Sequence, residues 1–127
     1  MRQIKFRAKS IRTNEWVYGN LRIFGERAYI SAVDSHAHSE VFLSTVGQYT
    51  GLTDRNGKEI YEGDIVEACS QGEHRKCEVA WSEKTVSFFL KHSVGPWSLS
   101  GAWGKESCEV IGNIYDNPEL LKKSDHE

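Results

Sequence analysis

The sequence lacks any feature that would anchor the chain in a membrane or export it. No apolar run approaches the ~18 residues of a membrane-spanning helix, and residues 1–7 hold no apolar signal-peptide core. We therefore expect neither a membrane nor export. The net charge of -2, with 27% charged residues, argues against a disordered chain. The 127 residues suffice for one domain, or for two small subdomains that share a core.

Cysteine is scarce, and its spacing disfavours a metal site. The chain has three cysteines, an odd number that is typical of reduced thiols in a cytoplasm. The candidate zinc ligands are Cys69, His74, Cys77 and Cys108. Structural zinc usually binds through tight Cys-x2-4-Cys pairs, and no such pair is present. We expect no metal, and we interpret Cys77 and Cys108 as small core residues.

Motifs for catalysis are missing as well. The sequence has neither a Gly-x-Ser-x-Gly nucleophile elbow nor a Gly-x-x-x-x-Gly-Lys phosphate loop. His36 and His38 would share one face of an extended segment, but they lack further ligands, so a polar surface loop is favoured. Cys69 and His74, across a turn, form the one conceivable nucleophile and base pair. We expect no catalytic residue, no cofactor and no enzymatic activity.

Alternating apolar and polar residues predict a mainly β chain. The predicted strands cover residues 4–9, 16–24, 28–31, 41–43, 65–68, 76–82, 86–90 and 108–113. Asn56–Gly57 and Gly63–Asp64 are strong turn signals, and the second is interpreted as structural. The residues expected to be mostly buried are Ile4, Phe6, Ile60, Ile65, Val66, Val79, Trp81, Phe88, Val110 and Ile111.

Four acidic residues gather around the Gly63–Asp64 turn, at Glu59, Glu62, Asp64 and Glu67. Such a cluster could hold a hard metal ion or perform acid–base chemistry. Successive strand residues point to opposite faces, however, and a turn intervenes, so these carboxylates should diverge. We interpret them as solvated turn carboxylates.

The first predicted strand carries a basic outer face. Lys5, Arg7 and Lys9 alternate with apolar residues and would point away from the core. They are the candidate nucleic-acid contacts, with Trp16 and Tyr18 close enough in sequence to stack bases. A solvated face that discourages edge aggregation explains the same charges. The pI of about 6.2 also opposes a dedicated nucleic-acid protein.

Three segments together resemble one protein family. The central block is 45–66, TVGQYTGLTDRNGKEIYEGDIV, and the outer segments are 4–8, IKFRA, and 110–120, VIGNIYDNPEL. They are similar to the YopX family of small proteins encoded by bacteriophages and prophages. The resemblance spans nearly the whole chain, although residues 69–107 match no family motif. The family usually has Trp where this chain has Lys9, which could cost a packing aromatic.

The resemblance implies a fold more than a function. It implies a mainly β protein with a small SH3-like β-barrel in its C-terminal part, and no established activity, catalytic residue or cofactor. We expect an N-terminal β subdomain with a hairpin (1–48), packed with a barrel-like subdomain (49–121), and a frayed tail (122–127). The barrel-like subdomain should end in a short helix with Asn117 as N-cap and Pro118 first.

The expected role is that of a phage- or prophage-derived accessory protein in the cytoplasm of a bacterial host. A non-enzymatic module that binds another macromolecule, most simply a protein, fits the absence of a catalytic constellation. Trp97 and Trp103, among turn-forming glycines, are candidate partner anchors or plugs for a barrel end. The alternatives are nucleic-acid binding through the basic strand, and a small enzyme with an unrecognised site. Exposed sheet edges favour a homo-oligomer.

Overall fold

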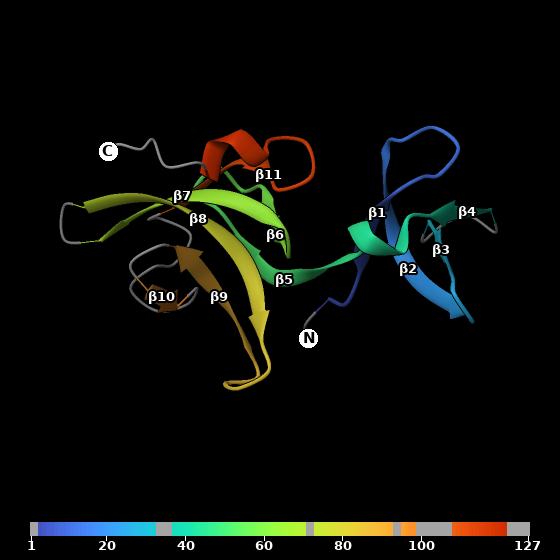
Figure 1. Cartoon of the computed structure of the whole chain (residues 1–127), viewed down its shortest axis with the longest axis horizontal. Helices are drawn as coiled ribbons and strands as arrows, with labels where there is room; N and C mark the ends of the chain where they lie inside the picture. Colours follow the sequence, from blue (N-terminus) through green and yellow to red (C-terminus); the bar gives the residue numbers. More distant parts are fainter. Residues whose placement is uncertain (1–2, 33–36, 71–72, 93–94, 99–107, 122–127) are drawn as a thin grey trace. The chain divides into compact units, whose positions relative to one another are not determined.

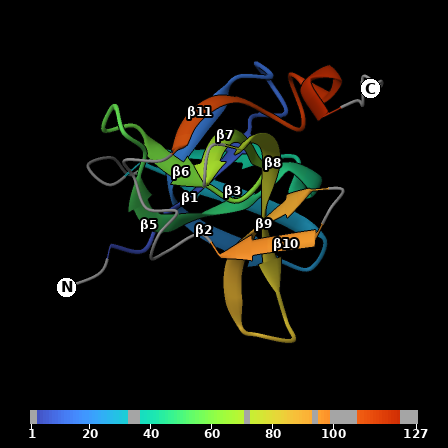
Figure 2. The same cartoon turned by 90° about the vertical axis from the view of Figure 1, so that its left-hand side faces the viewer.

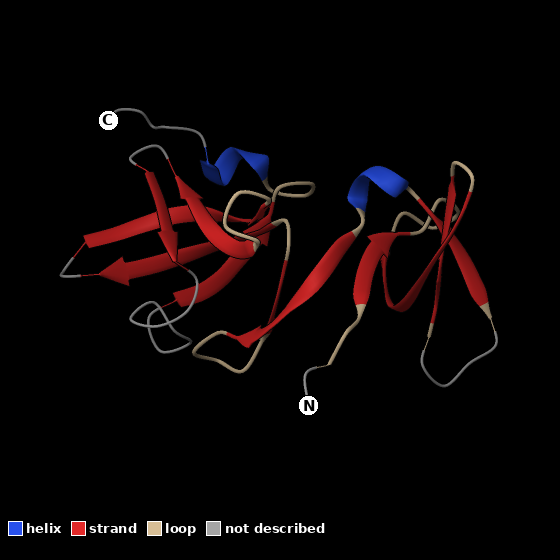
Figure 3. Cartoon of the chain, turned by 90° about the horizontal axis from the view of Figure 1, so that it is seen from below, coloured by secondary structure: helices blue, strands red, loops and turns tan. Residues whose placement is uncertain are grey.

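The computed structural model describes residues 3–32, 37–70, 73–92, 95–98 and 108–121. Its contacts divide the chain into two compact units, Met1–Gly51 (unit 1) and Leu52–Glu127 (unit 2). Antiparallel strands dominate both units, as Figure 3 shows in red, so the prediction of a mainly β protein is confirmed.

Unit 1 is a curved antiparallel sheet. Its elements are β1 (Phe6–Lys9), β2 (Trp16–Phe24), β3 (Arg27–Ser31), β4 (His38–Val41), the 3-10 helix η1 (Leu43–Thr45) and β5 (Gly47–Thr53), which carries the chain into unit 2. The hydrogen-bonded order is β4-β3-β2-β1-β5, followed by β6 of unit 2 (Figure 1). A bridge between Ser10 and Val41 links β4 to the residue after β1, so the sheet curls around its concave face.

A small apolar cluster fills the concave face of unit 1. Its buried members are Ala8, Ala28, Ile30 and Val41, with Phe6, Val17, Leu21 and Val46 packed against them. The backbones approach closely at Gly19, where an added Cβ would lie 2.0 Å from the carbonyl oxygen of Ser31. A glycine is therefore required there, because any side chain would collide with β3.

Unit 2 is built on a five-stranded antiparallel sheet. Its elements are β6 (Glu59–Tyr61), β7 (Asp64–Ser70), β8 (Glu73–Ser82), β9 (Ser87–His92), β10 (Gly95–Ser98), β11 (Cys108–Asn113) and the 3-10 helix η4 (Pro118–Leu121). The sheet order is β10-β9-β8-β7-β11, and Figure 2 shows β9 and β10 as neighbouring arrows. Its core consists of Ile60, Val66, Ala68, Cys77, Val79, Leu90 and Cys108. The interpretation of both cysteines as core residues is confirmed.

The structure corrects two of the predicted core residues. Ile60, Ile65, Val66 and Val79 are fully buried, and Phe6, Phe88, Val110 and Ile111 are half-buried. Ile4 is 56% exposed, because it precedes β1, which begins only at Phe6. Trp81 is 41% exposed, because it lies past the core near the β8–β9 turn, with its ring edge-on to Phe88.

The end of the chain also differs from the expectation. The predicted C-terminal helix is not supported beyond one short turn: Pro118–Leu121 forms the 3-10 helix η4, in which the Leu120 amide donates to the Asn117 carbonyl, three residues back. The Asn117 side chain accepts from the Asn113 amide, so it closes the preceding turn. In the described residues the sheet of unit 2 is open, and the SH3-like barrel stays a prediction.

Candidate functional site

The family-like block at residues 45–66 has a structural role. The buried Asp54 carboxylate accepts hydrogen bonds from the amides of Asn56 at 2.8 Å, Lys58 at 2.9 Å and Val110 at 2.8 Å. This clamp joins the β5–β6 turn to β11. Burial alone would raise the pKa of Asp54, but the three amide donors outweigh it, and the pKa lies below its ordinary value.

The acidic cluster around Gly63–Asp64 does not converge on a site. Asp64 is buried and accepts a hydrogen bond from the Tyr61 amide at 2.7 Å, so its interpretation as a solvated carboxylate is wrong. Glu59 accepts from the Tyr61 hydroxyl at 3.0 Å, whereas Glu67 lies further along β7. Within the described part of the chain, no group of acidic, His or Cys side chains could hold a metal ion.

The candidate thiol and imidazole residues have separate roles. Cys69 and His74 lie opposite each other in the β7–β8 register, whereas Cys77 and Cys108 are buried in the core. Burial raises the pKa of the Cys77 thiol to about 12 and also raises that of Cys108. A thiol with so high a pKa is a poor nucleophile and a poor metal ligand at neutral pH.

The remaining imidazole and indole candidates are only partly described. His38 is exposed on β4, while His36 lies outside the described residues. Trp97 occupies β10, where its backbone pairs with Leu90, and Trp103 lies outside the described residues. The proposed roles of Trp97 and Trp103 as partner anchors therefore stay predictions.

Cations and aromatic rings alternate on the convex face of unit 1, which we call the outer face. It carries Arg7 and Lys9 on β1 and Lys5 directly before that strand, which is the face predicted for them from the sequence. The register places Arg7 opposite Tyr18 and Lys9 opposite Trp16 on β2. The Tyr49 amide of β5 donates to the Lys5 carbonyl, which brings that strand alongside. The outer face thus spans three adjacent strands.

Arg7 is the exception among these cations, because it is buried. Its guanidinium carbon lies 4.5 Å from the centre of the Trp16 ring, and only 5% of the residue is exposed. The prediction that Arg7 points freely outward is wrong: alternation determined the face correctly but could not reveal that Trp16 covers it. Arg7 therefore holds the indole in place, and its position does not suit a phosphate contact.

Lys5 and Lys9 are half-buried, and each ammonium group lies over a ring. The Lys5 nitrogen is 5.3 Å from the centre of Tyr49, and the Lys9 nitrogen is 5.5 Å from the centre of Trp16. Such contacts hold long side chains near the sheet surface. Lys9 therefore contributes to the packing around the Trp16 ring.

The outer face continues along β2 from Tyr18, which the sequence indicated, to Arg22 and Phe24, which the sequence analysis did not identify. Val17 and Leu21 pack into the core, so Tyr18, Arg22 and Phe24 lie on the opposite side of the strand. Tyr18 is 48% exposed and Phe24 is 60% exposed. The Arg22 guanidinium lies 5.8 Å from the Phe24 ring centre. Extending the alternation from Tyr18 to residue 24 would have found Arg22 and Phe24.

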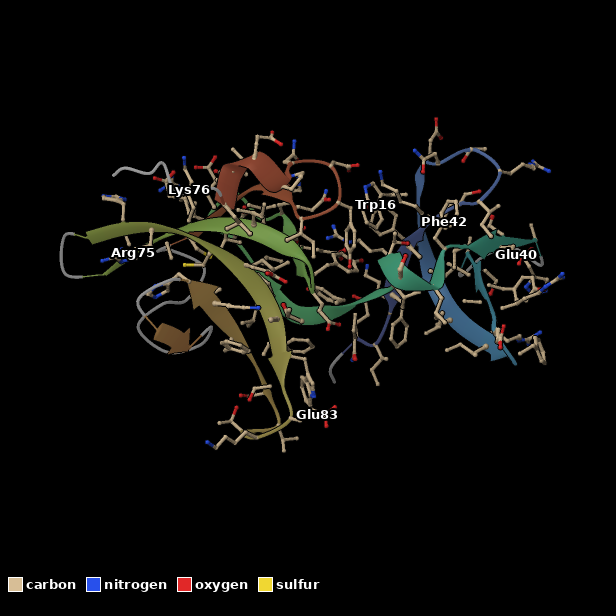
Figure 4. All side chains as sticks on the ribbon, viewed as in Figure 1. Trp16, Glu40, Phe42, Arg75, Lys76 and Glu83 are labelled. Atoms are coloured by element: carbon tan, nitrogen blue, oxygen red, sulfur yellow. The ribbon has the colours of Figure 1, made fainter. Side chains whose placement is uncertain are left out.

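The far edge of the outer face is paired with β3 and β4. Phe24 meets Tyr29 edge-on at 6.2 Å between ring centres. Arg27 lies 3.8 Å from the Glu40 carboxylate. A hydrogen bond with Tyr29, and then the nearby Glu40, raise the pKa of Arg27 above its ordinary value. Figure 4 labels Trp16, Glu40 and Phe42 among the side chains of unit 1.

The two units differ in net charge. Unit 1 has seven Lys and Arg residues against four Asp and Glu, a net charge of +3. Unit 2 has nine against 14, a net charge of -5. The overall charge of -2 therefore conceals a basic unit, and it cannot by itself argue against a polyanionic ligand on the outer face.

The architecture defines a two-unit, mainly β protein, and comparison assigns its family. The YopX protein family model matches residues 5–122, so the chain belongs to the YopX family. The crystal structure of protein EF1440 from Enterococcus faecalis is similar, with 25% sequence identity and a TM-score of 0.57. That similarity covers 96% of this chain and 100% of the other. No curated protein sequence matches the chain.

The described residues also bear on the expected relation to membranes. This part of the chain contains no helix with the length and apolarity that crossing a bilayer demands.

Proposed function

We propose that this YopX protein is a non-enzymatic accessory module that binds another macromolecule through unit 1. One observation carries the proposal: exposed large apolar side chains concentrate in unit 1. Among the described residues they are Ile4, Ile11, Tyr18, Ile23, Phe24, Phe42 and Leu43 in unit 1, against Leu52, Trp81 and Val86 in unit 2. The concentration of apolar exposure in one unit supports an interaction role for that unit, whereas single exposed residues need no explanation.

The roles of the perturbed titratable groups also support binding over catalysis. A catalytic carboxylate or thiol must be accessible to substrate, with a pKa suited to its task. Asp54 is instead saturated by backbone amides, and Cys77 and Cys108 are buried in the core with raised pKa values. Each of these shifts has a structural explanation.

The biological context is part of the same proposal. Membership of the YopX family is the reason to propose a phage or prophage origin and a place in the bacterial cytoplasm. An SH3-like barrel remains the expected scaffold for the C-terminal part. Self-association through sheet edges remains the proposed assembly. The rival proposal of a small enzyme would need a site outside the residues discussed above.

Affinity capture from bacterial lysate tests the proposed function. The bait is the full chain, either unchanged, with Tyr18→Ser and Phe24→Ser combined, or with Trp81→Ser as the matched exposed aromatic of unit 2. We expect the unchanged chain and Trp81→Ser to retain the same macromolecules, and the double variant to lose them. Equal capture by all three, with all three folded, would contradict a binding role for unit 1.

A further inference from the structure

We propose that the outer face of unit 1 binds single-stranded nucleic acid. Tyr18 and Phe24 would stack on bases, while Lys5, Lys9 and Arg22 would contact the phosphate backbone. This inference rests on the proposed function and specifies its ligand. The proposed surface differs in two ways from the basic strand that the sequence suggested. Arg22 replaces Arg7 as a phosphate contact, and the surface extends along β2.

The stacking residues share one face of a single strand. Val17 and Leu21 pack into the core of unit 1, which directs Tyr18 and Phe24 away from it. These two rings are among the most exposed aromatics of the described chain. Proteins that bind single strands without strict sequence preference combine such ring faces with a cationic track. A duplex hides its base faces, so this surface favours unpaired strands.

The cationic side chains lie close to the aromatic residues in the pairing of β1 with β2 and along β2 itself. Lys9 pairs in register with Trp16, two residues before Tyr18, and Arg22 lies two residues before Phe24. Alternate residues of a strand are about 6.8 Å apart, so Arg22 and Phe24 are neighbours on one side of β2. The ammonium groups of Lys5 and Lys9 lie over the rings of Tyr49 and Trp16, on the two strands that pair with β1.

The charge distribution favours a polyanion on unit 1. Its net charge is +3, and Glu40 is the one acidic residue within strands β1 to β4. Glu40 is itself close to the cationic Arg27. The -5 charge of unit 2 would repel a polyanion, so binding should be confined to unit 1.

Fluorescence anisotropy with the full chain tests the inference. The probe is a labelled mixed-sequence DNA or RNA strand of about 20 nucleotides, longer than the roughly 4–16 nucleotides that a small β module covers. Tyr18→Ala and Phe24→Ala should each weaken binding by roughly 5- to 150-fold. Tyr18→Phe should preserve affinity because it keeps the ring, and Trp81→Ala, the control in unit 2, should leave affinity unchanged.

Salt dependence tests the cationic contacts separately. For a single strand each phosphate contact contributes about -0.7 to the log–log slope, so three cations predict a slope of about -2. Combining Lys5→Ala with Lys9→Ala should reduce its magnitude by about 1.4. The matched control combines Lys84→Ala with Lys91→Ala, two exposed lysines of unit 2, and should leave the slope unchanged.

Four outcomes would overturn the inference: no binding at low salt, preference for duplex over single strands, equal losses in the unit 2 controls, or full affinity in Tyr18→Ala and Phe24→Ala. The lysate capture shows whether nucleic-acid binding alone fails or whether the proposed binding role of unit 1 fails with it. If nuclease-treated lysate still yields a protein that only the Tyr18 and Phe24 variant loses, unit 1 binds macromolecules but the ligand is not nucleic acid. If neither assay depends on the outer face, both proposals fail.

Discussion

Units 1 and 2 are both antiparallel β structures, yet they place their side chains differently. Among the residues that the structure describes, unit 2 buries seven in one cluster, while the corresponding cluster of unit 1 has four, two of them alanines. Unit 1 exposes more large apolar side chains among the described residues and is basic, whereas unit 2 is acidic. This difference is the basis of our proposal that unit 1 is the interacting unit, with unit 2 contributing mainly to stability.

The largest effect is expected from Gly19→Ala in unit 1. The new Cβ would lie 2.0 Å from the Ser31 carbonyl oxygen, at a φ of +153°, so β2 and β3 would have to separate. We expect a loss of about 4 kcal/mol in the free energy of unfolding, because such a backbone collision cannot be relieved by side-chain movement. Denaturant unfolding measures the loss.

Gly25→Ala is the matched control for that substitution. Gly25 also has a positive φ, of 60°, but nothing lies within 4 Å of its added Cβ. Gly25→Ala should therefore lower the free energy of unfolding only by the left-handed backbone strain, about 1–2 kcal/mol. Equal losses in the two variants would show that the close contact between β2 and β3 does not matter.

Thiol chemistry tests the core of unit 2. With a pKa of about 12 against an ordinary 9.0, Cys77 should have a thiolate fraction roughly 10³ lower than an unperturbed thiol at the same pH. Under native conditions, one equivalent of a thiol reagent should therefore react rapidly at Cys69, with Cys77 and Cys108 reacting only after unfolding. Mass spectrometry of the labelled peptides measures this, and rapid native labelling of Cys77 would contradict the buried core.

Asp54→Asn should destabilise unit 2 by about 3 kcal/mol, because an amide nitrogen would face one of the three backbone donors. The folded pKa lies below the ordinary 3.8, so the carboxylate stabilises the fold at neutral pH. That contribution should be lost as the pH falls below 3.8 through the folded pKa. Chemical unfolding at several pH values should show a shallower acid dependence in the variant than in the native protein.

The exposed Glu83, labelled in Figure 4 at the end of the β8–β9 hairpin, provides the control. Glu83→Gln removes a carboxylate from the same unit but leaves the Asp54 clamp intact. It should change the unfolding free energy by less than about 0.5 kcal/mol. A loss comparable to that of Asp54→Asn would mean that charge, rather than the clamp, stabilises unit 2.

The smallest effect is expected at Val86 in the same hairpin. This β-branched residue has a φ of 53° and is largely exposed, so its backbone is strained without compensating burial. Val86→Asn should stabilise unit 2 by about 1 kcal/mol, because Asn tolerates the left-handed region. Thermal unfolding measures the gain, and a loss of stability would contradict the assigned turn conformation.

Much of the strand pattern could be predicted, because it depends on local alternation. Exposure could not be predicted equally well. The position of Ile4 beyond the start of β1, and the cover that Trp16 gives Arg7, both depend on which residues pair across the sheet. The Asp54 clamp was missed for the same reason, since its partner Val110 lies 56 residues away. The outer face was found only in part, because the alternation was not extended to Arg22 and Phe24.

Nuclear magnetic resonance of the full chain tests the central claim, that unit 1 is the interacting unit, most directly. Amide shifts are followed while a single-stranded oligonucleotide is added. Changes should concentrate at residues 5–9 and 16–24, where the outer face of unit 1 lies, while the amides of β7, β8 and β9 stay unchanged. Shifts concentrated in those three strands, or no shifts at saturating oligonucleotide, would contradict the account.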